Sequence, residues 1–254
     1  QYSPIGAIIA YRAESFDILI GPGRSVSSVP VAIVGGIDKV PQMSFWATSP
    51  ALDDREFYPY FMRTTPADTA IAMALMDYLV DNKMLAVQVM YVDEDYGAAD
   101  ARALTVYGDA MGIQVNAVSF VDNDQNSILE ALKVVRSNKL HIIICMSYEV
   151  DTYFIIQTAD DWGMIGPDYL WIWTDSLLES FFEDYSKPEL IAGHIRLRSI
   201  GGVPGYEPWE KFQQYMRNIT DLDARYSARL PGSITVDDDL LDNTYIDTLC
   251  AYSM

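Results

Sequence analysis

Short apolar runs rich in β-branched residues alternate along this chain with longer stretches in which hydrophobic residues recur at helical spacing. The apolar runs predict strands at 16–20, 42–45, 85–92, 113–120, 140–146 and 169–173. The amphipathic stretches predict helices at 3–15, 24–37, 67–82, 97–112, 126–138 and 149–164. This alternation is typical of βαβ units, and continuous apolar strands such as LHIIICM fit burial on both faces of a sheet. We therefore predict an α/β fold with parallel sheets flanked by helices.

The pattern becomes irregular after Trp173, with one strand-like stretch at 194–202 and a helix candidate at 207–217. An acidic loop is expected at 218–240, and a last helix begins near Asp242. The sequence opens in a helix that no strand precedes and stops inside another helix. We therefore expect a piece of a larger α/β protein, truncated at both ends.

Composition narrows the classes of function. The 254 residues are 50% hydrophobic and 21% charged, which is ordinary for one or two globular domains. The 17 basic and 36 acidic residues give a net charge of −19, which argues against nucleic acid or an anionic membrane surface as a main partner. Two cysteines and two histidines are too few for a disulfide scaffold or a cysteine-based zinc site. We expect no metal and no cofactor, and no apolar run reaches the length of a membrane helix.

The turn Gly21-Pro22-Gly23 is the most informative local signal, because it joins a predicted strand to a helix that begins near Ser25. A helix start offers unpaired N–H groups and the positive end of the helix dipole, so it can bind an anion. We expect Ser25 to cap the helix and to add its hydroxyl. Neither the P-loop nor the dinucleotide pattern is complete, since Val26 replaces the last glycine of the latter, so a carboxylate fits better than a phosphate. The alternative is an ordinary capped turn.

Other polar or aromatic residues follow predicted strands or open predicted helices, where α/β sheets hold their ligands. They are Thr48, Asp68, Tyr96, Tyr148 and Asp175. Four of them also have a purely structural interpretation: Thr48 as a turn residue, Asp68 as a helix cap, Asp175 as a helix cap or turn residue, and Tyr148 as an aromatic side chain at the edge of the sheet. The acidic run at 93–95 lacks the spacing of a calcium loop. No pairing of a nucleophile with a base is present, so we expect no catalysis.

Taken together, these positions resemble the ligand-binding region of class C G-protein-coupled receptors, which has the two-lobed type I periplasmic-binding-protein fold. The stretches IGPGRSVSS, ATSPALDDREFYPYFMRTTPAD and DNTYIDTLCA carry the resemblance, which extends to metabotropic glutamate and type B γ-aminobutyrate receptors. It implies that Ser25 holds the carboxylate of an amino acid. It also implies that the ammonium group is held by Thr48, Asp68, Tyr96 and Asp175.

Two positions depart from the family. Thr65 stands where the γ-aminobutyrate-type receptors carry a histidine that contacts the ligand. Trp46 stands where glutamate receptors carry a smaller residue, which would narrow the cleft. The resemblance therefore favours a class of ligand and leaves its identity open.

The resemblance also implies an organisation, with part of lobe 1 at 1–66, lobe 2 at 67–198 and a return to lobe 1 at 199–254. We expect a receptor region on the extracellular face of the plasma membrane that senses an α-amino acid or a close analogue by cleft closure. A dimer through lobe 1 and membrane attachment through a region C-terminal to this sequence are expected. The alternatives are the ectodomain of a receptor guanylate cyclase, a solute-binding protein for amino-acid transport, and an interaction module whose cleft is vestigial.

Overall fold

A computed structural model describes residues 3–174, 176–177, 181–182, 185–197, 205–207, 209–211 and 214. The chain divides into two compact units, residues 1–199 and 200–254, and the elements below belong to the first. Its helices are α1 (Pro4–Ala13), α2 (Ser25–Asp38), α3 (Asp68–Asp81), α4 (Asp95–Met111), α5 (Gln125–Asn138), α6 (Glu149–Asp161) and α8 (Pro188–Ile191), with a 3₁₀ turn η1 at Pro50–Asp53. Its strands are β1 (Leu19–Ile20), β2 (Gln42–Ser44), β3 (Phe61–Arg63), β4 (Ala86–Val92), β5 (Gln114–Phe120), β6 (Ile142–Met146), β7 (Leu170–Trp173) and β8 (Ile195–Arg196).

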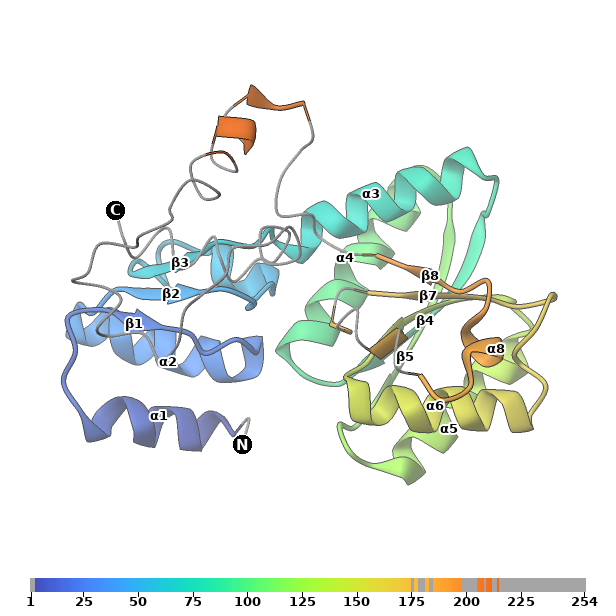
Figure 1. Cartoon of the computed structure of the whole chain (residues 1–254), viewed down its shortest axis with the longest axis horizontal. Helices are drawn as coiled ribbons and strands as arrows, with labels where there is room; N and C mark the ends of the chain where they lie inside the picture. Colours follow the sequence, from blue (N-terminus) through green and yellow to red (C-terminus); the bar gives the residue numbers. More distant parts are fainter. Residues whose placement is uncertain are drawn as a thin grey trace. The chain divides into compact units, whose positions relative to one another are not determined.

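The first three strands form a parallel sheet in the order β1-β2-β3. Helices α1 and α2 lie together on one side of it (Figure 1). Its small core consists of Ala32, Ala47, Leu52 and Phe61. Because the strands are parallel, the loops that leave β1 and β2 emerge at the same edge.

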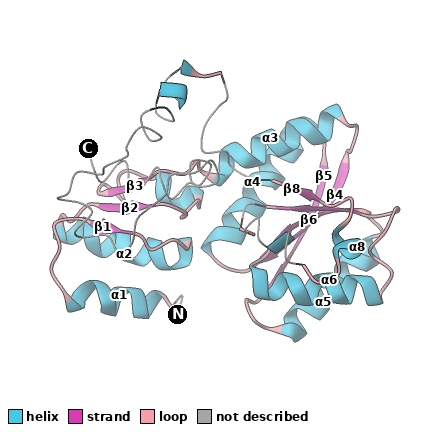
Figure 2. Cartoon of the chain, viewed as in Figure 1, coloured by secondary structure: helices cyan, strands magenta, loops and turns pink. Residues whose placement is uncertain are grey.

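The other five strands form a second parallel sheet in the order β5-β4-β6-β7-β8. Helices α3 and α4 cover one face and α5 and α6 cover the other (Figures 1 and 2). The central strands are buried along most of their length, and Val89, Ile144 and Ile172 have 0% exposure. Burial on both faces explains why these strands are apolar at successive positions. The predicted α/β class, with parallel sheets flanked by helices, is confirmed.

Several elements differ from the sequence-based expectation. The strand predicted at 16–20 is only Leu19–Ile20, and β3 and η1 lie in a stretch for which no element was predicted. β3 has only three residues, too few to show an alternation of hydrophobic and polar positions. Its pairing with β2, in which Gln42 lies opposite Phe61, makes it a strand. The short helix α8 interrupts a segment that was expected to be irregular. Most of the helix expected at 207–217, the acidic loop and the last helix lie outside the described residues.

The two sheets are built from residues 19–63 and 86–196. The predicted division into lobes at 66/67 and 198/199 stays a prediction. Within the part of the chain that the structure describes, no helix is both long enough and apolar enough to cross a bilayer.

Candidate functional site

A small cavity lies at the carboxyl ends of the parallel strands, with about 20 Å³ open to a water-sized sphere and about 300 Å³ when the open solvent at its mouth is included. Its lining residues are Gly23, Arg24, Ser25, Trp46, Thr48, Tyr96, Tyr148 and Ser176. We call the residues that follow β1 and β2 (Gly23–Ser25, Trp46 and Thr48) the α2 wall. We call those that follow β4, β6 and β7 (Tyr96, Tyr148 and Ser176) the tyrosine wall. Strand ends of this kind are where α/β folds bind ligands, and four of the six predicted site residues lie here.

The α2 wall begins with the turn that leads into helix α2. Two serine hydroxyls fix this turn, since Ser28 and Ser44 both donate to the carbonyl of Pro22, at 2.6 and 2.7 Å. Gly23 lies so close to the Phe45 ring that an added Cβ would be 3.2 Å from it. The first residues of α2 are thereby held at the cavity.

Ser25 lies at this helix start but does not cap it, so that part of the prediction was wrong. The N-cap residue is Arg24, which makes no side-chain capping bond, and Ser25 is the first helical residue. Its buried Oγ accepts a hydrogen bond from the amide of Ser49 at 3.2 Å. The hydroxyl therefore joins the helix start to the loop that holds Thr48.

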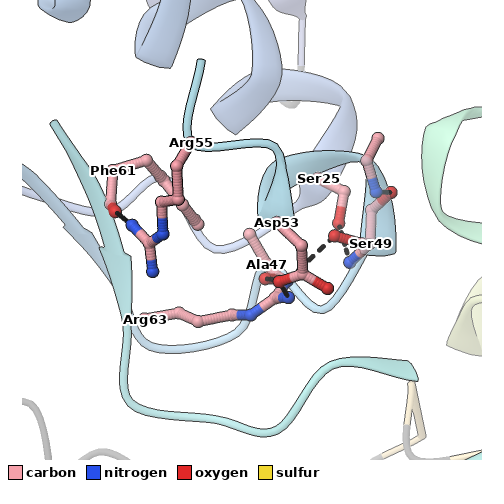
Figure 3. A network of polar contacts seen from close by, with 8 residues as sticks. Ser25, Ala47, Ser49, Asp53, Arg55, Phe61 and Arg63 are labelled. Carbon is pink, nitrogen blue, oxygen red and sulfur yellow. Dashed lines mark hydrogen bonds and ion pairs between the residues drawn. The ribbon is translucent and has the colours of Figure 1, made fainter. Parts of the chain in front are cut away.

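Arg63 holds that loop in shape (Figure 3). Its guanidinium donates to the carbonyls of Ala47 and Ser49 at 3.1 and 2.8 Å and forms an ion pair with Asp53. Arg55 donates in turn to the carbonyl of Phe61 on β3. The Arg63 side chain therefore fixes both residues that flank Thr48. No pattern in the sequence indicated this role for Arg63.

Of the two predicted acids, Asp68 and Asp175, the structure describes only Asp68. Asp68 is the first residue of α3 and is buried, and its amide donates to the carbonyl of Thr48 at 3.1 Å. Asp68 is therefore next to Thr48 through the backbone, although it is not among the residues that line the cavity. Asp175 lies outside the described residues, and the neighbouring Ser176 lines the cavity and donates to the carbonyl of Ser147 at 2.7 Å.

The tyrosine wall is held by hydrogen bonds at the phenol ends. The hydroxyls of Tyr96 and Thr174 are 2.6 Å apart, and the hydroxyl of Tyr148 donates to the carboxylate of Glu94. The two rings lie 5.9 Å apart between centroids. Burial raises the pKa of Tyr148 above its ordinary value, and burial also raises the pKa of Glu94 against the opposing effect of the Tyr148 hydrogen bond. Hydrogen bonds therefore hold both rings in place, and the Tyr148 phenol stays protonated.

Gly97 explains why helix α4 can begin directly against the end of β4. A Cβ added at Gly97 would lie 2.2 Å from the carbonyl oxygen of Val92 and 3.0 Å from its Cγ1. Only a residue without a side chain allows this approach. The Tyr96-Gly97 pair therefore places the Tyr96 ring in the wall.

Arg24, like Ser176, lines the cavity and was missed by the sequence analysis. It is the one charged side chain among the described residues that line the cavity. Its guanidinium carbon lies 3.5 Å from the centroid of the Tyr148 ring, and its Nη1 lies 3.5 Å from Oδ2 of Asp122. Its place at the start of α2, next to Ser25, was a signal that could have identified it.

The site offers hydrogen-bond donors and aromatic faces rather than a metal centre. Over the described positions, no three histidine, cysteine or acidic side chains are grouped to hold a metal ion. The α2 wall presents a helix start, with backbone N–H groups and hydroxyls that suit an anionic group. The tyrosine wall presents two rings that suit a cation, and one of them, Tyr148, already carries the Arg24 guanidinium. In the arrangement described, the space between the walls holds about one water molecule. The walls nevertheless present groups that suit the two ends of a small dipolar molecule.

Comparison with known proteins gives a family match over most of the chain. The family profile described as "Receptor family ligand binding region" matches residues 2–234. The chain is 29% identical over 216 residues to "Metabotropic glutamate receptor-like protein E" of Dictyostelium discoideum, covering 80% of this chain and 26% of that protein. It is 34% identical over 213 residues to "G-protein coupled receptor family C group 6 member A" of Carassius auratus, covering 79% and 23%.

A third relative is human "Metabotropic glutamate receptor 8", with 25% identity over 213 residues, 82% of this chain and 23% of that protein. The matched region is thus about a quarter of each of these relatives.

Proposed function

The chain belongs to the family of receptor ligand-binding regions, and on that premise we propose that it binds an α-amino acid or a close analogue by closing its cleft. The resemblance to class C receptors that the motifs indicated is confirmed at the level of the family. The relatives are receptors by name, and the proposed role is ligand sensing without catalysis.

The observation that carries the proposal is the chemistry of the two walls. We assign the ligand carboxylate to the α2 wall, where Ser25 begins a helix and exposes its dipole end to the cavity. We assign the ammonium to Thr48 and to the face of Tyr96, since the Arg24 guanidinium already lies against the Tyr148 ring. Asp68 and Asp175 are proposed as the acids that balance the ammonium charge.

Closure follows if one ligand contacts both walls. The α2 wall follows strands of the three-stranded sheet, and the tyrosine wall follows strands of the five-stranded sheet. A molecule bound to both walls stabilises the arrangement in which the walls are close, and so shifts the population toward it. In a receptor this shift would be the signal.

The wider setting is also a proposal. The relatives are named as receptors and are about four times as long as the matched region, so we propose that this chain is the extracellular part of a membrane receptor. Dimerisation through lobe 1 is proposed with it. A single membrane span with a cyclase domain downstream, or no span at all, would instead favour a guanylate cyclase ectodomain or a solute-binding protein.

Calorimetric titration of the purified full-length protein with the twenty amino acids and γ-aminobutyrate tests the proposal. We expect at least one ligand to bind, and the Asp175→Ala variant to lose about 2–5 kcal/mol of binding free energy because the ammonium is left unpaired. Thr48→Ala should weaken the same ligand about tenfold, the loss expected of one hydrogen bond to a charged group.

Thr105→Ala is the matched control, since the Thr105 hydroxyl donates to the carbonyl of Ala101 within α4 and is not part of the cavity lining. It should leave binding unchanged. If no compound of the panel binds to the folded protein, the amino-acid proposal is wrong.

A further inference from the structure

Arg24 connects the two walls of the cavity without a ligand. Its backbone belongs to the α2 wall, while its guanidinium lies 3.5 Å from the ring centroid of Tyr148 in the tyrosine wall. The same group reaches Asp122, which follows β5, at 3.5 Å. The side chain is only 17% exposed, so the stacked guanidinium is largely shielded from water. A cation on an aromatic face gains most in such a setting.

The surface that receives Arg24 is fixed in advance. The Tyr148 ring is held by its hydrogen bond to Glu94, and Tyr148 itself is the N-cap residue of α6. In the same loop, the amide of Asn123 donates to the two carboxylate oxygens of Asp151 at 3.2 and 3.3 Å, which orders the loop after β5. The partners of the guanidinium are therefore already ordered, so the contact costs little of their conformational freedom.

A second contact joins the same two sides. The hydroxyl of Ser49, next to Thr48, donates to the backbone carbonyl of Asp95 at the start of α4, at 3.0 Å. This contact is neutral and needs no particular side chain at position 95. Arg24 therefore provides the charged, residue-specific part of the connection.

We propose that Arg24 is an internal tether that stabilises the closed form of the cleft before any ligand binds. It places a cation on a ring of the tyrosine wall, which is the kind of contact that the proposed function assigns to the ligand's ammonium group. The inference rests on that proposed function for the meaning of closure, and it adds that closure has a ligand-independent component. The tether sets the fraction of closed molecules at rest, and hence the basal signal.

The test measures the closed fraction in the absence of amino acids. Spin labels on the exposed positions Ile37 of α2 and Val134 of α5 report the distance between the two sides in the full-length protein. Arg24→Ala should lower the ratio of closed to open molecules about tenfold, equivalent to about 1.4 kcal/mol. Arg24→Lys, which keeps the charge but loses the planar face, should lower it by a smaller factor.

Arg12→Ala is the matched control. Arg12 pairs with Asp38 at 2.8 Å, and both residues lie on α1 and α2, on the same side of the cavity. Its loss should leave the distance distribution unchanged. Asp122→Asn removes the carboxylate on the other side and should act in the same direction as Arg24→Ala, which provides a second measurement if Arg24→Ala folds poorly.

The outcomes separate the tether from the proposed ligand. If Arg24→Ala and Asp122→Asn both keep the wild-type distance distribution, the tether is overturned, whether or not an amino acid binds. If they open the unliganded protein while no amino acid binds to the wild type, the tether stands and the proposed ligand class fails.

Discussion

Gly97 offers a sharp test of how the tyrosine wall is built. Alanine normally stabilises a helix relative to glycine by about 1 kcal/mol. At Gly97 the new Cβ would lie 2.2 Å from the carbonyl oxygen of Val92, where an ordinary contact is about 3.5 Å. The start of α4 must therefore move by about 1 Å away from the end of β4. Such overpacking costs about 1–3 kcal/mol and occasionally more.

We expect Gly97→Ala to lower the free energy of unfolding by about 2 kcal/mol, since the steric cost exceeds the gain in helix propensity. For a protein of this size the melting temperature should fall by about 4–8 °C. The shift also separates the Tyr96 hydroxyl from Thr174, so affinity for the ligand should fall about fivefold with the loss of one hydrogen bond. Urea unfolding and calorimetric titration measure the two effects.

Gly36→Ala is the matched substitution. Gly36 lies within α2, and a Cβ there would meet the Pro59 ring at ordinary contact distances, Cδ at 3.7 Å and Cγ at 3.9 Å. This variant should gain about 0.5–1 kcal/mol of stability. If Gly97→Ala also stabilises the protein, then α4 does not begin against β4 as described, and the argument for the placement of Tyr96 fails.

Three further predictions follow from the contacts around the cavity and the second sheet. Arg63→Met should weaken ligand binding about tenfold without altering the protein's secondary structure by circular dichroism, because two carbonyls of the Thr48 loop lose their donor. Tyr96→Phe and Thr174→Val should each lower the free energy of unfolding by about 1 kcal/mol. The double variant should lose no more stability than either single variant, because both remove the same hydrogen bond. Additive losses would contradict that hydrogen bond.

The third prediction of this group concerns His194, whose pKa burial lowers to about 4 from an ordinary 6.5. Because the folded state stays neutral while the unfolded chain takes up a proton, stability is complete above pH 6.5 and is lost as the pH falls toward 4. Between pH 7 and pH 5 the contribution of His194 to this loss should be about 2 kcal/mol. Urea titrations should show it as the difference in pH dependence between the wild type and His194→Asn, because the raised pKa of Asp151, about 6, acts with the opposite sign in both proteins.

Four of the site residues could be predicted because one geometric rule places them. Ser25, Thr48, Tyr96 and Tyr148 each follow a parallel strand, and parallel strands of one sheet bring their carboxyl ends to one edge. Neither the depth of each side chain nor its partner could be predicted in this way. The hydroxyl of Ser25 was expected at a helix cap and instead accepts from Ser49, a contact across 24 residues.

Arg24 could not be predicted from the sequence because its partners are remote. Asp122 and Tyr148 follow it by 98 and 124 residues, and no periodicity relates them. Strand β3 could not be predicted for the same reason, because its three residues form a strand only by pairing with β2. Arg63 of β3 then holds the loop that contains Thr48. Local pattern indicates where an element lies, whereas pairing between distant segments decides which side chains support it.

The separation of lining loops from buried strands has a consequence for how such a site diverges between lineages. Each wall residue sits beyond the last hydrogen-bonded pair of its strand, so a replacement there leaves the ladder between strands intact. Recognition of a different ligand can therefore change one loop at a time, while the sheets need no accompanying change.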